Sequence, residues 1–167
     1  MRMNKLSLVR LVKKVNSSEK IKKTITVFCY LVSLLTVFVF AYMLLYFARS
    51  SLILAIKYII VLGFPFLLVG LVRKIVKAPR PYELYDFFEK PPRAGEGDSF
   101  PSRHSFSVFA IGTLCLLVSP VLGIITLVFG ALLCFCRVAQ GIHFVRDVVA
   151  GALVGTISSL IGVLVLI

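Results

Sequence analysis

Two histidines and one aspartate are the residues of this sequence best suited to covalent and acid–base chemistry. His143 and Asp147 are four residues apart, so on a helix the carboxylate can approach the imidazole and accept its N–H. This contact would fix the imidazole tautomer and leave the other ring nitrogen free to attack. His104, the other histidine of the chain, can protonate a leaving group as a general acid.

Cationic side chains accompany both histidines, and their chemistry suits an anionic substrate. Arginine presents a planar fork that matches phosphate oxygens, and lysine supplies a point charge. Ser102 follows Pro101 at a predicted helix start, where free backbone N–H groups favour an anion. The predicted phosphate-binding residues are Ser102, Arg73 or Lys74, Arg80, Arg103 and Arg137.

Long apolar segments must position these residues. The chain has 167 residues, of which 59% are hydrophobic and 16% are charged, and a soluble domain of this size would carry far more charge. The apolar runs match the ~20 residues that a helix needs to cross a bilayer. The predicted fold is therefore all-α, an integral membrane bundle with five spans at residues 25–47, 52–72, 103–119, 121–140 and 148–167.

Two segments fall outside these spans. Residues 1–24 mix basic and apolar side chains, which predicts an N-terminal amphipathic helix on an anionic membrane surface, with a disordered basic tail as the alternative. Residues 25–167 would then form one transmembrane domain. Residues 73–102 are rich in Pro and Gly, so we expect a loop with at most short helices. We expect its acidic residues to be solvated charges, with a headgroup site as the alternative; they are Glu83, Asp86, Glu89, Glu96 and Asp98.

The order of the spans predicts that the polar residues meet. Consecutive spans alternate in direction, so the end of the second, the start of the third, the end of the fourth and the start of the fifth share one membrane face. Ionisable groups near a bilayer mark function by default. In the last span, Gly151, Gly155 and Ser159 recur at four-residue spacing, which predicts a close helix-packing face.

The charge balance limits the partners. The formal net charge is +12, which suits anionic lipid headgroups and phosphate. Nucleic acid is excluded because no soluble domain is predicted that could present a basic face. The four cysteines lie inside apolar runs, where they read as small buried hydrophobic residues. The sequence does not indicate an oligomeric state.

Three motifs together resemble the type-2 phosphatidic acid phosphatase family, which also includes glucose 6-phosphatase and the vanadium haloperoxidases. The family carries Lys, six residues, Arg-Pro; then Pro-Ser-Gly-His; then Ser-Arg, five residues, His, three residues, Asp. The matching positions follow in the same order and at the same spacing: Arg73 to Arg80-Pro81, Pro101-Ser102-Arg103-His104, and Cys136-Arg137, His143 and Asp147.

The resemblance assigns roles to these residues. It implies that His143 becomes a phosphohistidine, that Asp147 orients it and that His104 protonates the leaving oxygen. It also implies that Arg80, Arg137 and Ser102 hold the phosphate and that no metal or other cofactor takes part. Three residues depart from the family pattern: Arg73 for lysine, Arg103 for glycine and Cys136 for serine. None of these departures removes a predicted nucleophilic or proton-transfer group.

The expected function is therefore that of a membrane lipid phosphatase, a metal-independent hydrolase of the multi-pass membrane type. The candidate substrates are undecaprenyl pyrophosphate, phosphatidylglycerophosphate and phosphatidic acid. A non-catalytic lipid-binding or transport protein of the same fold is the alternative. The basic N-terminus argues for a cytoplasmic start, whereas the resemblance implies an active site on the outer face of the cell membrane.

Overall fold

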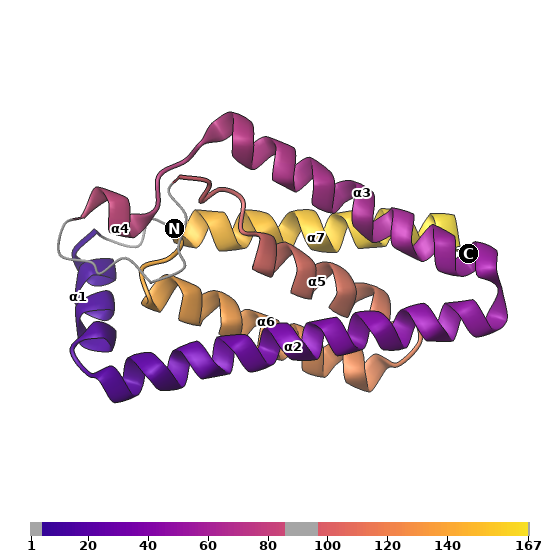
Figure 1. Ribbon diagram of the computed structural model, residues 1–167, viewed down its shortest axis with the longest axis horizontal. Coiled ribbons are helices and arrows are strands. Elements are labelled where there is room, and N and C mark those ends of the chain that lie inside the picture. Colours follow the sequence, from indigo (N-terminus) through magenta and orange to yellow (C-terminus); the bar gives the residue numbers. More distant parts are fainter. Residues whose placement is uncertain (1–4, 86–96, 167) are drawn as a thin grey trace.

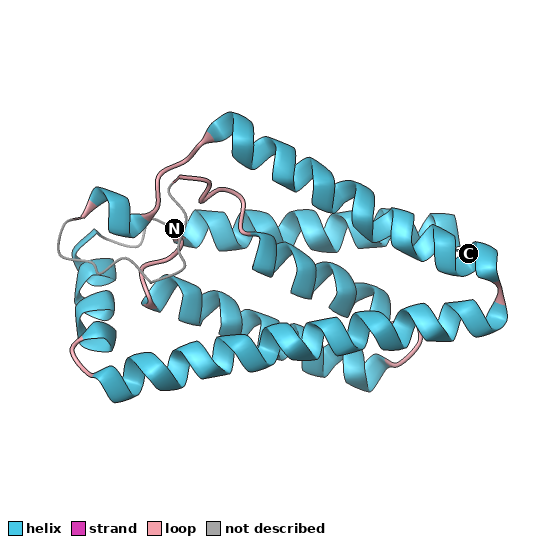
Figure 2. Ribbon diagram, viewed as in Figure 1, coloured by secondary structure: helices cyan, strands magenta, loops and turns pink. Residues whose placement is uncertain are grey.

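The fold is a bundle of helices, seen here in a computed structural model that describes residues 5–85 and 97–166. Figure 2 shows that the described residues form helices and loops without strands. In chain order the helices are α1 (Lys5–Asn16), α2 (Glu19–Ser50), α3 (Leu52–Val76), α4 (Pro81–Leu84), α5 (Arg103–Cys115), α6 (Pro120–Ala139) and α7 (Val145–Leu166).

Four of these helices, α2, α3, α6 and α7, are long and apolar enough to cross a membrane. Large hydrophobic side chains cover their outer surfaces; Leu45 of α2 is 63% exposed and Leu67 of α3 is 70% exposed. Such a surface suits lipid rather than water. The predicted all-α membrane bundle is confirmed.

The third predicted span forms a shorter helix than expected. α5 ends at Cys115 instead of residue 119 and has 13 residues, or about 20 Å of helix against a hydrocarbon core of about 30 Å. It packs against α2, α3, α6 and α7, so protein surrounds it. The turn after Cys115 is satisfied internally, since Val118 N–H donates to Cys115 O at 3.1 Å.

Small residues bring α7 against α5, as predicted. A Cβ added at Gly151 would collide with Ser102 O, and one added at Gly155 would collide with Phe106 O. Ser159 Oγ donates to Ala110 O at 2.8 Å. The two backbones are therefore in direct contact along this face, and the contact fixes the start of α5 beside the start of α7.

The N-terminal helix is shorter than predicted. α1 ends at Asn16, and residues from Glu19 onwards belong to α2, which starts after the N-cap residue Ser18. Val12 of α1 is fully buried in a cluster with Tyr82. Figure 1 shows α1 across the end of the bundle that also carries α4, opposite the turn between α2 and α3.

Candidate active site

The predicted site residues meet at the end of the bundle that α1 and α4 cover (Figure 1). They come from the last turn of α3, the start of α4, the first residues of α5, the end of α6 and the loop before α7. His104 lies close enough to Arg137 and His143 to interact with both electrostatically. Segments that are up to 74 positions apart in the chain, from Arg73 to Asp147, thus form one site.

A tight loop after α6 places His143. Gly141 adopts a left-handed backbone with φ of 71°, a conformation that glycine takes without steric cost. The loop then turns back on α6, because the N–H groups of Ile142 and His143 both point to Arg137 O, at 3.1 and 3.4 Å. This geometry ties the candidate nucleophile to the backbone of a predicted phosphate-binding arginine.

Burial governs the protonation of His143, whose side chain is only 3% exposed. Removal from solvent lowers the pKa of His143 below its ordinary value, Asp147 acts in the opposite direction, and the charges of Arg80 and Arg137 lower the pKa further. The imidazole is therefore neutral at neutral pH, which is the form that can act as a nucleophile.

Asp147 is fully buried and lies beside His143, at 3.7 Å between Oδ2 and Nδ1. That distance is longer than a hydrogen bond. Oδ2 accepts hydrogen bonds from Phe144 N–H at 2.9 Å and from Ser99 Oγ at 2.5 Å. Ser99 Oγ also lies 3.2 Å from His143 Nδ1, so a serine stands between the two predicted partners.

Ser99 is not among the site residues predicted from the sequence. It lies in a loop without periodicity, two residues before the Pro-Ser-Arg-His motif, and serine in a loop is ordinarily a solvated residue. Here it is fully buried. Only its position directly before a chemistry-bearing motif marked it as a candidate.

The first motif holds the second in place. Arg73 is 5% exposed, and its Nη1 donates to Pro101 O at 2.8 Å. Lys74 is exposed and lines a separate surface hollow with Lys77, Gly97 and Asp98. Of the two alternatives, Arg73 is therefore the one that contacts the site.

Arg80 is fixed by a carboxylate expected to be solvated. Glu83 accepts hydrogen bonds from Arg80 N–H at 2.9 Å and from Gly97 N–H at 2.6 Å. Arg80 Nε donates to Gly97 O at 3.1 Å. The expectation for Glu83 is thus wrong, because backbone N–H groups of two loop segments share its oxygens. Asp86, Glu89 and Glu96 lie outside the described residues.

Ser102 and Arg137, both predicted to bind phosphate, differ in how their hydrogen-bond donors are used: the Ser102 N–H is paired within the protein, whereas Arg137 Nε is not. Ser102 is the N-cap of α5; its buried hydroxyl accepts from Ser105 N–H, and its own N–H donates to Asp147 O at 2.9 Å. Arg137 Nε is buried and has no hydrogen-bond partner in the described part of the chain. A buried guanidinium N–H without a partner is costly, and a phosphate oxygen would satisfy it. Cys136, at the family's serine position, packs against the cluster of Cys29 and Leu133.

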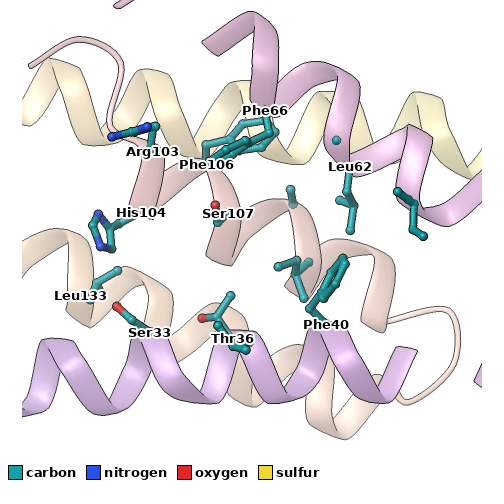
Figure 3. A pocket seen from close by; sticks show the side chains of 15 residues that line it. Ser33, Thr36, Phe40, Leu62, Phe66, Arg103, His104, Phe106, Ser107 and Leu133 are labelled. Atoms are coloured by element: carbon teal, nitrogen blue, oxygen red, sulfur yellow. The ribbon is translucent and has the colours of Figure 1, made fainter. Parts of the chain in front are cut away.

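Arg103 and His104 are exposed at the polar end of a largely apolar cavity (Figure 3). The cavity has a volume of about 540 Å³ and is lined by side chains of α2, α3, α5 and α6. In Figure 3, Phe66 and Leu62 of α3 face Ser33 and Thr36 of α2 across it. These two hydroxyls donate to carbonyls of their own helix, Cys29 O and Val32 O, each at 2.8 Å. The hydroxyl hydrogens of Ser33 and Thr36 are therefore not available to a molecule in the cavity.

Known proteins resemble this chain in part of its sequence and in its fold. A stretch of 63 residues is 40% identical to the bacitracin transport permease protein BcrC of Bacillus licheniformis and covers 38% of this chain and 31% of that relative. The fold matches Aquifex aeolicus LpxE with a TM-score of 0.69 at 24% identity, over 98% of this chain and 99% of that one. It also matches a transmembrane PAP2-type phosphatidylglycerolphosphate phosphatase of Bacillus subtilis, with a TM-score of 0.69 at 22% identity over 97% and 85% of the chains.

The family assignment follows from the match to a family model over most of the chain. Residues 52–166 match the model of the PAP2 superfamily. This range contains all three motifs and every predicted site residue. The chain belongs to the PAP2 superfamily.

Proposed function

We propose that the protein hydrolyses a phosphate monoester or a pyrophosphate of a membrane lipid, through a phosphohistidine on His143. The observation that carries this proposal is the apolar cavity that starts at Arg103 and His104. It joins a phosphate-binding end to a space that suits hydrocarbon. A substrate with both chemistries is a lipid phosphate.

The reaction would proceed in two steps. Partial burial and the charge of Arg137 lower the pKa of His104 in the free protein, and a bound anionic phosphate would offset that charge and favour its protonated form. His143 Nε2 attacks phosphorus while the protonated His104 donates its proton to the leaving oxygen, so the P–O bond breaks as the P–N bond forms. His104, now neutral, then accepts a proton from a water that attacks the phosphohistidine. This second step releases phosphate and restores both histidines. Arg80 and Arg137 would hold the phosphoryl oxygens throughout, and no step needs a metal ion.

The lipid tail would lie between α2 and α3. Two residues that line the cavity, Val37 and Ile59, are 61% and 48% exposed, so the cavity opens toward the surrounding lipid. The Bacillus subtilis relative is, by its name, a phosphatase of phosphatidylglycerolphosphate. The same headgroup, undecaprenyl pyrophosphate and phosphatidic acid are the candidates here.

The test is phosphate release by purified protein in detergent with EDTA, for each of the three lipids. We expect release by the wild type and none by His143→Ala, because the variant lacks the nucleophile. A matching water-soluble headgroup phosphate without the lipid tail should be a much poorer substrate. Equal release by His143→Ala would refute the nucleophile. Activity that is lost in EDTA and restored by magnesium would refute the metal-free mechanism.

The alternative is a lipid-binding or transport protein without turnover. The word permease in the name of the Bacillus licheniformis relative is the observation that favours it. A wild-type protein that binds these lipids but releases no phosphate from any of them would support this alternative.

We also propose that the active site faces the outside of the cell membrane, as the family resemblance implies. The basic residues around the site would then serve to bind anionic headgroups. Arg10 and Lys14 of α1 are exposed at the same end of the bundle as the site, where they would attract such lipids.

A further inference from the structure

Ser99 connects the two residues that the family resemblance treats as direct partners. Its hydroxyl oxygen lies 2.5 Å from Asp147 Oδ2 and 3.2 Å from His143 Nδ1. The direct distance between Nδ1 and Oδ2 is 3.7 Å, beyond hydrogen-bond range. All three residues are buried, with exposures of 0%, 3% and 0% for Ser99, His143 and Asp147. Their hydrogen-bond partners are therefore protein groups and not bulk water.

The hydrogen atoms of these contacts can be assigned by counting donors. Asp147 Oδ2 accepts from the backbone N–H of Phe144, and an ionised carboxylate can only accept. The single hydrogen of the Ser99 hydroxyl therefore points to Asp147. Toward His143 the hydroxyl oxygen can only accept, so Nδ1 must carry a hydrogen. In a neutral imidazole this leaves Nε2 without one, in the form that can attack.

We propose that Ser99 is a positioning residue that transmits the effect of Asp147 to His143 and fixes the Nδ1–H tautomer of the nucleophile. This inference rests on the proposed function. Ser99 touches neither the substrate nor the reacting atoms; it acts through His143. Without the hydroxyl, Nδ1 would have no acceptor within hydrogen-bond distance from Asp147, and the imidazole could adopt either tautomer.

The backbone around Ser99 holds the hydroxyl where this role requires it. Ser99 N–H donates to Ala78 O at 2.9 Å, which anchors the loop to the segment after α3. Arg73, in the last turn of α3, donates to Pro101 O, and Ser102 N–H donates to Asp147 O. The loop is thus fixed at Ser99 and on its C-terminal side, to α3 and the segment that follows it and to α7.

The kinetic test compares Ser99→Ala with Ser159→Ala. Ser159 is also a fully buried serine with one hydrogen bond, but it lies far along α7 and contacts Ala110 O. We expect Ser99→Ala to lower kcat by about 10- to 100-fold, the range seen when a group that orients a ligand imidazole is lost, with little change in KM. Ser159→Ala should keep the wild-type kcat.

A double variant separates a relay from general loss of structure. Because Ser99 and Asp147 act through one chain of hydrogen bonds, Ser99→Ala combined with Asp147→Asn should cost no more than the more severe single variant. Losses in kcat that multiply would overturn the proposal, and so would a wild-type kcat in Ser99→Ala. If Ser99→Ala does not fold, Ser99→Cys replaces it in the test. Because a thiol is only a weak donor and acceptor, we expect its kcat to fall below that of the wild type, and an unchanged kcat would overturn the proposal.

The tautomer can be observed without turnover. The chain has two histidines, so long-range ¹H–¹⁵N spectra of histidine-labelled protein contain two ring systems, and His104→Gln assigns them. We expect a hydrogen on Nδ1 of His143 in the wild type and a mixture of tautomers in Ser99→Ala. An Nε2–H tautomer in the wild type, or identical spectra for both proteins, would overturn the inference. Absence of wild-type turnover with a fixed Nδ1–H tautomer would instead refute the proposed function alone.

Discussion

His143 and Glu83 illustrate how single residues obtain their properties from the folded chain. In isolation an imidazole titrates near pH 6.5, and a loop glutamate is a solvated charge. Here one is enclosed among arginines and the other accepts two backbone hydrogen bonds. Both changes follow from the packing of the loops, and each leads to a measurable effect.

The lowered pKa of His143 predicts a specific pH dependence of stability. Below about pH 6.5 the unfolded chain takes up a proton on this residue, whereas the folded protein does not until its lower pKa is reached. Stability is therefore complete above that pH and declines as the pH falls. Thermal unfolding in detergent from pH 8 to pH 4.5 should show this loss in the wild type relative to His143→Gln, which cannot titrate. Parallel curves would contradict the prediction.

Glu83→Gln is expected to destabilise the site around Arg80. A glutamine has one carbonyl oxygen and cannot replace both carboxylate oxygens, so one backbone N–H of Arg80 or Gly97 loses its acceptor, at about 1–3 kcal/mol. We expect a lower melting temperature and a higher KM. Glu19→Gln is the control, because Glu19 is 85% exposed and only pairs with Lys22. An equal decrease in the melting temperature of both variants would show that the hydrogen bonds of Glu83 do not stabilise the site.

Sequence reasoning found the motif residues but missed Ser99 and misjudged Glu83. The motif residues are recognisable because ionisable side chains seldom have a purely structural role in an apolar membrane chain. By contrast, a loop serine or a loop glutamate, such as Ser99 or Glu83, is commonly a solvated residue without a specific role. The roles of these two residues depend on which loop segments meet, and loops without periodicity give no indication of that.

Some features of the helices were likewise predictable from the sequence and others were not. The spans were predictable because a bilayer imposes a minimum apolar length. The early end of α5 was not, since it depends on neighbouring helices that shield the turn after Cys115. The small residues of α7 were recognised as a packing face, but only the structure shows that they meet the backbone of α5 at Ser102 and Phe106.

A larger side chain in place of one glycine would occupy the cavity between α2 and α3. Gly63 lines the cavity, and an added Cβ would have no atom within 4 Å. Gly63→Leu should therefore fold normally and reduce turnover of long-chain lipids by about 10-fold or more, as expected if the tail loses one or two kcal/mol of binding. A short-chain or soluble phosphate should be affected much less.

Gly70→Leu is the matched control for this variant. Gly70 lies on the same helix with the same free space, but it does not line the cavity. Equal losses in both variants, or no loss in Gly63→Leu, would show that the tail binds elsewhere.

Considered as a whole, the molecule has two distinct ends. α1, the start of α2 and the active site lie together, and the turn between α2 and α3 lies opposite (Figure 1). Single cysteines test which end faces outward. Ser17, just before α2, and Ser50, the last residue of α2, are both exposed and lie at opposite ends of this helix.

The proposed outer location of the site predicts the labelling pattern of intact cells. A membrane-impermeant maleimide should label Ser17→Cys and should label Ser50→Cys only after the cells are opened, with the wild type correcting for the native cysteines. The reverse pattern would place the site in the cytoplasm, in agreement with the basic N-terminus.

The contacts between the motifs bear on how the protein loses activity. Arg73 holds Pro101, Ser99 holds Asp147, Ser102 is held by Asp147 O, and Arg137 O holds the loop of His143. No segment of the chain contains a complete site, so partial unfolding of any of them disrupts the rest. Heat inactivation should therefore coincide with the loss of tertiary structure, and fragments that keep only two of the three motifs should show no residual turnover. Catalysis in this small bundle is thus an intrinsic reporter of its complete assembly.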